Sequence, residues 1–404
     1  MKKLLTFLSS FGLIATSSLL VISCKNNISA SKKEDHKDNE NIQSDQSDNK
    51  KVEKEKEKPK PKRQATEEEK KKLETIFKEQ ENAFGTFHTY KDVVDQLLVY
   101  ANEKGLKDIT LVDGLNPNEH LKEDKDGKGQ NVVKLKLYGS DVTFKPKKVL
   151  KDEVETIYSK DKKILKQIGY KKISSTEIKI SRITENIQEV PLHLPLKITS
   201  LREAFSESKV SKVKNLDKWN TKNIKSMYSV FENAMKFNQD ISAWDTSNVT
   251  DMSGMFKDAA QFNQSLNEWK VHNVVEMEDM FAGATSFNQD LDKWKTNSLK
   301  NIKQMFWYAT QFNGDISSWD VSKVTTLYNT FASAEKFNQD ISKWDVSNVT
   351  IMQGTFANAN SFDKNLSSWK VDKVTTTRDF NKNITNKLNN QKTPRFSKEI
   401  TYSS

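Results

Sequence analysis

The sequence has a single cysteine in 404 residues, Cys24, and it lies near the amino terminus. With one thiol, no disulfide can form within the chain, so its folded parts must rely on burial of apolar side chains. After Ile22 no apolar run is long enough to span a bilayer as a helix. These absences exclude a disulfide scaffold and a protein with several membrane-spanning helices.

Arginine is also scarce. The formal net charge of +10 suggests a nucleic-acid partner, but the chain has only five arginines: Arg63, Arg182, Arg202, Arg378 and Arg395. Over residues 196–381, 22 Lys and Arg minus 22 Asp and Glu gives a net charge of zero. A nucleic-acid-binding protein concentrates basic charge on its folded face, so we expect no nucleic-acid partner.

Histidine is rare and scattered, at His36, His88, His120, His193 and His272. This spacing provides neither a metal site nor a base partner for a nucleophile. The stretch from Asp124 to Gly129 faintly resembles a calcium loop, but Lys128 and Leu135 occupy the fifth and twelfth ligand positions. We therefore predict a turn there, and we expect no metal, no cofactor and no catalytic residues.

The amino terminus has the pattern of an export signal. Lys2 and Lys3 precede a largely apolar run, Leu4 to Ile22, and Ser23 then leads into Cys24. A single membrane-spanning anchor is one interpretation. The polar interruptions and the small residue before the thiol favour a cleaved lipoprotein signal over residues 1–23. We therefore predict a lipid on Cys24, which would anchor the protein in the cell membrane on its extracellular face.

Two polar segments flank the expected folded region. Residues 24–65 are rich in Lys, Glu, Asp, Asn and Ser and have no apolar period, which predicts a disordered, charged tether. Residues 382–404 are predicted to be a polar C-terminal tail.

Residues 66–195 have the pattern of a small α+β domain. Thr66 with Glu69, and Thr89 with Asp92, are spaced as capping boxes at the start of two helices, the second ending near Gly105. Alternating apolar residues then predict strands, which we place at 109–112, 133–137, 142–144 and 178–180.

The rest of the chain is dominated by tryptophan at a fixed interval. Seven of the eight indoles recur every 25 residues, and Trp307 is the exception; the seven are Trp219, Trp244, Trp269, Trp294, Trp319, Trp344 and Trp369. A large apolar ring at one interval indicates a repeated, stacked unit. We therefore predict a tandem-repeat array of about seven units over residues 196–381.

Within a unit, Val249, Met252, Phe256 and Ala259 are spaced as on one face of a helix, which predicts a short helix. The segment 266–269 is too short for another helix and predicts a strand or extended piece. Because helices cannot approach as closely as strands, we expect the stack to curve with its extended side concave. The off-phase first unit, 198–205, is predicted to be an N-terminal cap, and Thr377 with Phe380 a C-terminal one.

Three sets of repeat residues are candidates for binding. The seven regular tryptophans could be a ligand platform, but regular spacing favours a buried spine. Trp307 and Tyr308 stand where other units have small or polar residues, and they are our candidate partner contact. A column of asparagines could hold a metal with neighbouring aspartates, but we favour hydrogen bonding to backbone groups at a turn; it comprises Asn238, Asn263, Asn288, Asn313 and Asn338.

The unit itself is recognisable. The pattern Trp-Asp-x-Ser-Asn-Val-Thr-x-Met-x-x-x-Phe-x-x-Ala-x-x-Phe-Asn-Gln-Asp-Ile-Ser-x-Trp, as in 244–269 and 319–344, resembles the 25-residue repeats of BspA-like leucine-rich-repeat surface lipoproteins of mycoplasmas. The lead-in 190–205 is also similar to theirs. The resemblance implies an α/β fold with a right-handed leucine-rich-repeat-like solenoid, a surface location and no enzymatic residues. Units depart from the pattern at 294–299, at Gly314 and at Asp363.

The sequence is compatible with three functions. The favoured hypothesis is a lipid-anchored surface protein whose repeats mediate adhesion to a host or neighbouring macromolecule, either a protein or a glycan. The alternative is a variable antigenic coat protein without a specific ligand. An exported hydrolase or nutrient-binding protein with its site in residues 66–195 is disfavoured, because it would need a pocket with convergent titratable groups.

Overall fold

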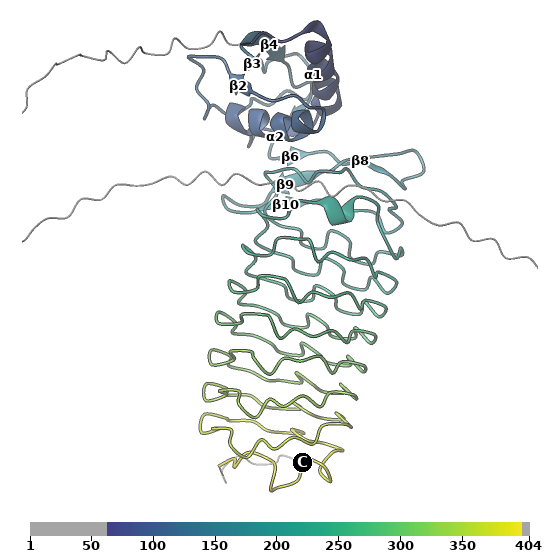
Figure 1. Cartoon of the computed structure of the whole chain (residues 1–404), viewed down its shortest axis with the longest axis vertical. Coiled ribbons are helices and arrows are strands. Elements are labelled where there is room, and N and C mark those ends of the chain that lie inside the picture. Colours follow the sequence, from purple (N-terminus) through teal and green to yellow (C-terminus); the bar gives the residue numbers. More distant parts are fainter. Residues whose placement is uncertain (1–62, 398–404) are drawn as a thin grey trace, which may run out of the picture. The chain divides into compact units, whose positions relative to one another are not determined.

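The computed structural model describes residues 63–397 (Figure 1). The predicted signal peptide, Cys24 and nearly all of the predicted tether lie outside the described residues. Neither helix between residues 63 and 397 combines the length and the apolar character needed to cross a membrane. The architecture is mixed α/β, with few helices, small sheets and a long stack of repeats (Figure 1).

The helices and strands are concentrated before residue 181. They are α1 (Glu67–Gln80), β1 (Phe84–Gly85), α2 (Tyr90–Glu103), β2 (Ile109–Leu111), β3 (Val133–Leu137), β4 (Ser140–Phe144), β5 (Val149–Leu150), β6 (Glu153–Val154), β7 (Ile157–Tyr158), β8 (Leu165–Gln167), β9 (Tyr170–Lys172), β10 (Ile178–Ile180) and the short 3-10 helix η1 (Leu216–Lys218). Strands β2-β3-β4 and β10-β9-β6 form two antiparallel sheets, β1 pairs parallel with β5, and β7 pairs with β8.

The local predictions for the small domain are confirmed. Both capping boxes are present: Thr66 and Glu69 exchange hydrogen bonds at the start of α1, and Thr89 and Asp92 do so at α2. After α2, Gly105 has φ +74° and the Leu106 amide donates to the Ala101 carbonyl, which is a Schellman-type ending. The four predicted strands correspond to β2, β3, β4 and β10.

The apolar core has two parts. The smaller cluster joins α1 and α2 to β2, β3 and β4, and includes Leu73, Leu97 and Leu135. The larger one runs continuously from Phe87 and Val154 to Leu388. Apolar packing of the repeat stack therefore begins before residue 196, within the sheet that contains β9 and β10.

The repeats stack through backbone hydrogen bonds between equivalent residues. Isolated parallel bridges join Ser226 to Asp251, Asp251 to Glu276 and Glu276 to Asn301, and they resume from Thr326 through Ile351 to Thr376. We call the residues from this bridge onward, 251–258 and their equivalents in the other repeats, the turn segments. Strand-like pairing between repeats is thus found where the turn segments begin. At 266–269 the chain makes a turn instead, in which the Trp269 amide donates to the Leu266 carbonyl. That prediction of a strand was wrong.

The predicted short helix is also wrong. In residues 252–258 every second amide donates to the following repeat: Met252 to Glu276, Gly254 to Glu278 and Phe256 to Met280, at 2.8–2.9 Å. Of the intervening amides, those of Met255 and Lys257 donate to carbonyls three residues back, and that of Ser253 donates to the Asp251 side chain, so no helical run forms.

Two left-handed positions per turn segment explain the error. One column of residues 25 or 26 apart has positive φ throughout: Glu203, Ser229, Gly254, Asp279, Gln304, Asn329, Gly354 and Asp379. A second column also has positive φ throughout: Glu207, Asn233, Asp258, Gly283, Tyr308, Ser333, Asn358 and Asn383. A left-handed residue at every fourth position turns Met252, Phe256 and Ala259 inward, just as a helix would. Periodicity alone cannot separate the two conformations.

Without helices the reason for the predicted curvature is absent. In the column that begins at Phe231, successive ring centroids are 5.5–5.7 Å apart up to Phe356. In the column that begins at Phe237 they are 5.7–6.1 Å apart up to Phe362. Neither column shows the spacing of about 8–10 Å between packed helices from which the curvature was predicted.

The ends of the stack differ from the predicted caps. The off-phase unit is an internal layer: Ser200 bridges Ser226 on one side and Lys179 of β10 on the other. At the other end Phe380 meets Phe356 edge-on, and Phe396 packs against Phe380 at 5.2 Å. Ile384 and Leu388 are buried, so residues 382–397 of the predicted polar tail help to close the core.

Candidate partner-binding surface

The seven regular tryptophans lie inside the stack, where they are 1–4 % exposed. Every indole N–H donates to a carbonyl 28 residues earlier in the chain, at 2.9–3.3 Å. Trp294, Trp319 and Trp344 stack face to face, with centroids 5.7 and 6.3 Å apart. Rings covered on both faces present no platform to a ligand.

The asparagine column forms a ladder that supports a turn, as predicted. The Asn238 Oδ1 accepts the Asn263 amide at 3.0 Å, and the Asn263 Oδ1 accepts the Asn288 amide at 2.9 Å. The pattern continues through Asn313 and Asn338 to the amide of Asp363. These side-chain oxygens are engaged by amides, which leaves no reason to assign them to a cation.

Replacing Asn263 with alanine tests the ladder. Its Oδ1 also accepts the Gln289 side-chain amide at 2.9 Å, so two hydrogen bonds are lost together. We expect the free energy of unfolding to fall by about 1–2 kcal/mol. The control is Asn360→Ala, because the side chain of this exposed asparagine makes no hydrogen bond between residues 63 and 397; it should change stability by less than about 0.5 kcal/mol. Equal effects in chemical denaturation would refute the ladder.

Trp307 and Tyr308 lie in a turn segment, at its sixth and seventh positions after the bridge. Tyr308 is 50 % exposed, and Trp307 is partly buried beside it. Their rings meet edge to face, with centroids 5.0 Å apart and planes at 78°. The backbone beneath is fixed, because Tyr308 donates to the Ala332 carbonyl and the Trp307 carbonyl accepts from Gly283.

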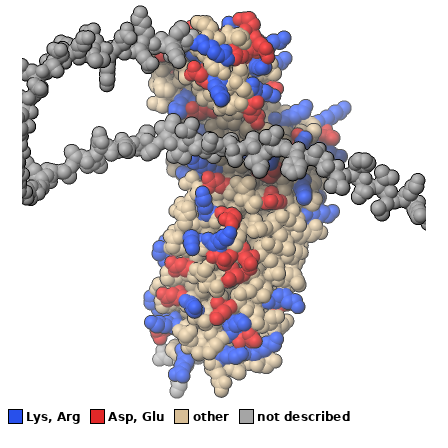
Figure 2. Space-filling view, viewed as in Figure 1, with Lys and Arg blue, Asp and Glu red and all other residues tan. Residues whose placement is uncertain are grey.

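Charged residues occupy an earlier part of the same surface. A cleft of about 250 Å³ crosses three repeats and is lined by Tyr228, Ser229, Glu232, Ser253, Gly254, Lys257, Glu278 and Asp279. Lys257 lies 2.8 Å from Asp279, and Lys303 lies 2.7 Å from Glu278. Figure 2 shows basic and acidic side chains intermingled along the repeats on the face in view. Because these charges pair with one another, they offer a partner little net field.

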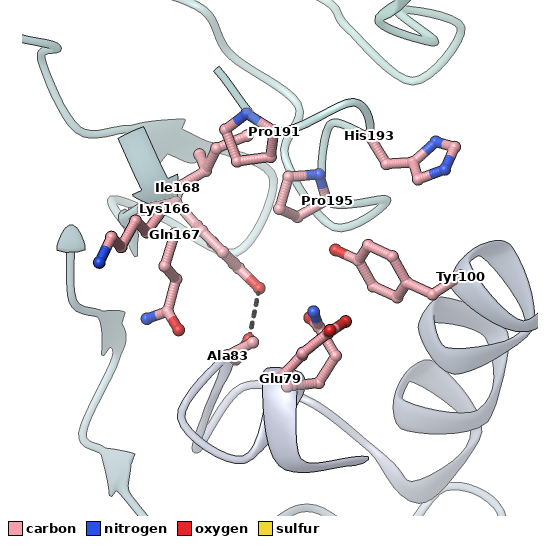
Figure 3. Close-up of a pocket in the computed structure, with 11 residues that line it drawn as sticks. Glu79, Ala83, Tyr100, Lys166, Gln167, Ile168, Pro191, His193 and Pro195 are labelled. Atoms are coloured by element: carbon pink, nitrogen blue, oxygen red, sulfur yellow. Dashed lines mark hydrogen bonds between the residues drawn. The ribbon is translucent and has the colours of Figure 1, made fainter. Parts of the chain in front are cut away.

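A second candidate is a cavity of about 60 Å³ next to the small domain (Figure 3). Tyr100 of α2 and Glu79 of α1 face Pro191, His193 and Pro195 across it. Burial raises the pKa of Tyr100 to about 12, so its hydroxyl keeps its proton at neutral pH. A space of this size accommodates a few water molecules. It is too small for a nutrient or a polymer, and its lining includes no serine, threonine or cysteine nucleophile.

One wall of this cavity belongs to a buried hydrogen-bond chain that the sequence did not reveal. The Tyr170 hydroxyl donates to the Ala83 carbonyl at 3.1 Å, the dashed line in Figure 3, and lies 3.1 Å from the His88 Nε2. The Gly85 amide donates to the His88 Nδ1 at 3.1 Å. These partners suit a neutral imidazole, and burial lowers the pKa of His88 to about 4. His88 therefore has a structural role.

One face of α2 also contacts the lead-in to the repeats. Asp92 lies 2.7 Å from the Lys197 Nζ, and the Gln96 Oε1 accepts the Leu196 amide at 2.7 Å. Tyr100 meets His193 edge-on at 5.6 Å. Polar residues at 92 and 96, one helical turn apart, are the sequence signal for this contact, although they do not identify the segment that is contacted.

The histidines and acidic residues described by the structure form no cluster suited to a metal ion. The faint calcium loop is a turn, as predicted: Asp124 accepts the amides of Lys128 and Gln130 at 2.8 and 3.0 Å, and these backbone hydrogen bonds lower the pKa of its carboxyl.

Comparison with protein families gives one finding. The chain matches the family described as "Mycoplasma protein of unknown function, DUF285" twice, over residues 199–312 and 289–394. Two overlapping matches are what a tandem array produces when a family description spans several units. No curated protein and no solved structure matches the chain.

Proposed function

Given that this is a repeat protein of the mycoplasma type, we propose that it is a lipid-anchored cell-surface protein. In this proposal its repeats mediate adhesion to a host or neighbouring macromolecule. The observation that carries the proposal is the aromatic pair Trp307 and Tyr308, held on a rigid backbone and left partly open to solvent. Exposed aromatic residues on a rigid scaffold are typical of residues that dominate binding energy.

The finer architecture belongs to the same proposal. We take the stack to be a right-handed leucine-rich-repeat-like solenoid of the BspA-like kind. Parallel bridges between successive repeats support this, because connections between parallel strands are almost always right-handed. Such arrays create extended surfaces that commonly serve for binding.

Membrane attachment through Cys24 supplies the location. The basic residues, the apolar run and the small residue before the thiol support lipoprotein processing. One acyl chain gives marginal binding, whereas two chains hold a protein stably on a bilayer. The proposal includes no reaction, no cofactor and no nucleic-acid partner, and the zero net charge of residues 196–381 supports the last of these.

Replacing Cys24 with serine tests the anchor. Cells expressing the unchanged protein should incorporate radioactive palmitate into it, and external protease should remove it from intact cells. Cys24→Ser should abolish the label, because no other thiol exists in the chain. An unlabelled or protease-shielded unchanged protein would end the proposal. As a control, Ser23→Ala keeps a small residue before the thiol and should leave labelling intact.

A variable antigenic coat protein is the second candidate. The buried columns keep Phe and Trp in nearly every repeat, whereas one half-buried column at the surface changes from Arg202 to Tyr228, Ser253, Glu278 and Lys303. Divergence confined to the surface is what immune selection would produce. This candidate expects purified protein to bind no panel of matrix proteins, mucins or glycans, and repeat numbers to differ between isolates.

A further inference from the structure

We propose that Trp307 and Tyr308 form a stacking platform for an uncharged sugar ring, so that the macromolecule bound is a neutral glycan. This inference deepens the proposed function and rests on it for the location, because a surface glycan is accessible only to a protein outside the cell. The binding chemistry itself depends only on the two side chains and their neighbours.

The first argument is backbone strain. Tyr308 has φ +56°, in the left-handed region where a bulky side chain costs roughly 1–2 kcal/mol. The equivalent positions in the neighbouring repeats have small residues, Asp258, Gly283, Ser333 and Asn358. Asn, Asp and Gly enter this region readily, but tyrosine does not. A strained residue that persists without necessity is an indication of function.

Burial does not compensate for this strain. The ring of Tyr308 is among the few large apolar groups that remain exposed between residues 63 and 397. Its hydroxyl makes no hydrogen bond to any of the described residues. The side chain therefore contributes little to folding, and an external ligand is the remaining source of favourable contacts for both the ring face and the hydroxyl.

The second argument is preorganisation. The edge-to-face contact with Trp307 orients the Tyr308 ring. Both residues sit on backbone that is hydrogen-bonded to the repeats on either side. Their flanking equivalents, Ala282 and Gly283 on one repeat and Ala332 and Ser333 on the next, are too small to stand as high as the aromatic rings. The platform is therefore rigid and projects above its neighbours, which lowers the entropy lost on binding.

The third argument is the absence of charge in the two columns that contain the rings. In these two columns the neighbouring positions from 282 to 358 are Ala, Gly, Ser and Asn. The charged members begin two repeats before Trp307, with Lys257 and Asp258, and three repeats after it, with Lys382. Nearby Lys303 is already paired with Glu278. Within these two columns an anionic sugar or a charged peptide would find no counter-charge. The next exposed charges, Glu335 and Lys336, have opposite signs and lie on the following repeat, where the Lys336 amide donates to the Thr310 carbonyl. The C–H face of a neutral sugar can lie on an aromatic ring while its hydroxyls bond to the phenol.

The test uses the full chain with Cys24→Ser, which removes lipid attachment, on an array of neutral, sialylated and sulfated glycans. We expect binding to neutral glycans, and Tyr308→Asn should weaken it about tenfold or more. Because asparagine is usual in this column, the same variant should raise the denaturation midpoint, so the loss cannot be ascribed to unfolding. The matched control is Tyr328→Ser, which removes a tyrosine from the same surface outside the platform and should leave binding unchanged.

The possible outcomes are distinct. Neutral glycan binding that survives Tyr308→Asn, preference for charged glycans, or no glycan binding at all would each overturn the platform. Capture of a protein partner that depends on Tyr308 would overturn the sugar assignment while leaving adhesion in place. Tyr308-dependent binding by a protein that fails the palmitate and protease tests would instead refute the surface location and leave the platform standing.

Discussion

Replacing Trp319 with alanine should lower the free energy of unfolding by about 3–5 kcal/mol, the range found for large aromatic residues removed from cores. Trp319 lies between Trp294 and Trp344 and donates its indole N–H to the Leu291 carbonyl at 3.0 Å. Truncation leaves a cavity that faces two repeats and a buried carbonyl without its donor. Because stability in a stacked array depends on interfaces between nearest neighbours, one substitution weakens both.

The matched control is Trp307→Ala, which removes the same side chain from the surface of the same repeat. We expect it to cost about 1 kcal/mol at most, since the ring is only partly buried. Trp319→Phe should fall between the two, because it keeps an aromatic ring but loses the indole donor. Urea denaturation followed by fluorescence of the remaining tryptophans gives all three values. Similar losses for Trp307→Ala and Trp319→Ala would contradict the division into spine and surface.

The second large effect should appear with acid. His88 has a pKa of about 4 in the folded chain, because burial disfavours its charged form, against 6.5 when unfolded. As pH falls below 6.5, His88 binds a proton in the unfolded chain but stays neutral in the folded chain. Stability should therefore decline between pH 6.5 and about 4, by about 3 kcal/mol in all, and this contribution should level off below that.

His88→Gln removes the titrating group and keeps a side-chain N–H donor in place of the imidazole that lies beside the Tyr170 hydroxyl. Its free energy of unfolding should be flatter than that of the unchanged protein across the same pH interval. The comparison of the two slopes isolates His88 from carboxyl groups such as Asp92 and Asp124, which titrate in both proteins. If the free energies of unfolding of the two proteins changed in parallel with pH, the His88 imidazole would not be held neutral in the folded chain.

The sequence predicted those features whose signal is local or strictly periodic. The capping boxes at Thr66 and Thr89 are decided by residues three apart, and the stack is decided by the tryptophan interval. The turn segments were missed because their inward positions match those of a helix. Recurrent Gly and Asp at 254, 258, 279 and 283 were the available signal for left-handed backbone.

The same distinction applies to the candidate site: the identity of its residues could be predicted from the sequence, but their geometry could not. Trp307 and Tyr308 could be selected from the sequence because they interrupt a column. The strain at Tyr308 and its edge-to-face contact with Trp307 depend on backbone conformation that no spacing reveals. The contact between α2 and residues 193–197 joins segments about 100 positions apart, as in the Gln96 to Leu196 hydrogen bond, and pattern alone cannot pair them.

The bonding between layers has a consequence for how such a chain can change in length. Equivalent amides and carbonyls meet at 25-residue intervals, so whole units can be duplicated or deleted in the gene while every junction keeps its register. Each unit added before Tyr308 would lengthen the stack by about 5 Å, the spacing of paired strands. The array would then act as an adjustable spacer, in which the chemistry of one contact stays fixed while its distance from the small domain varies.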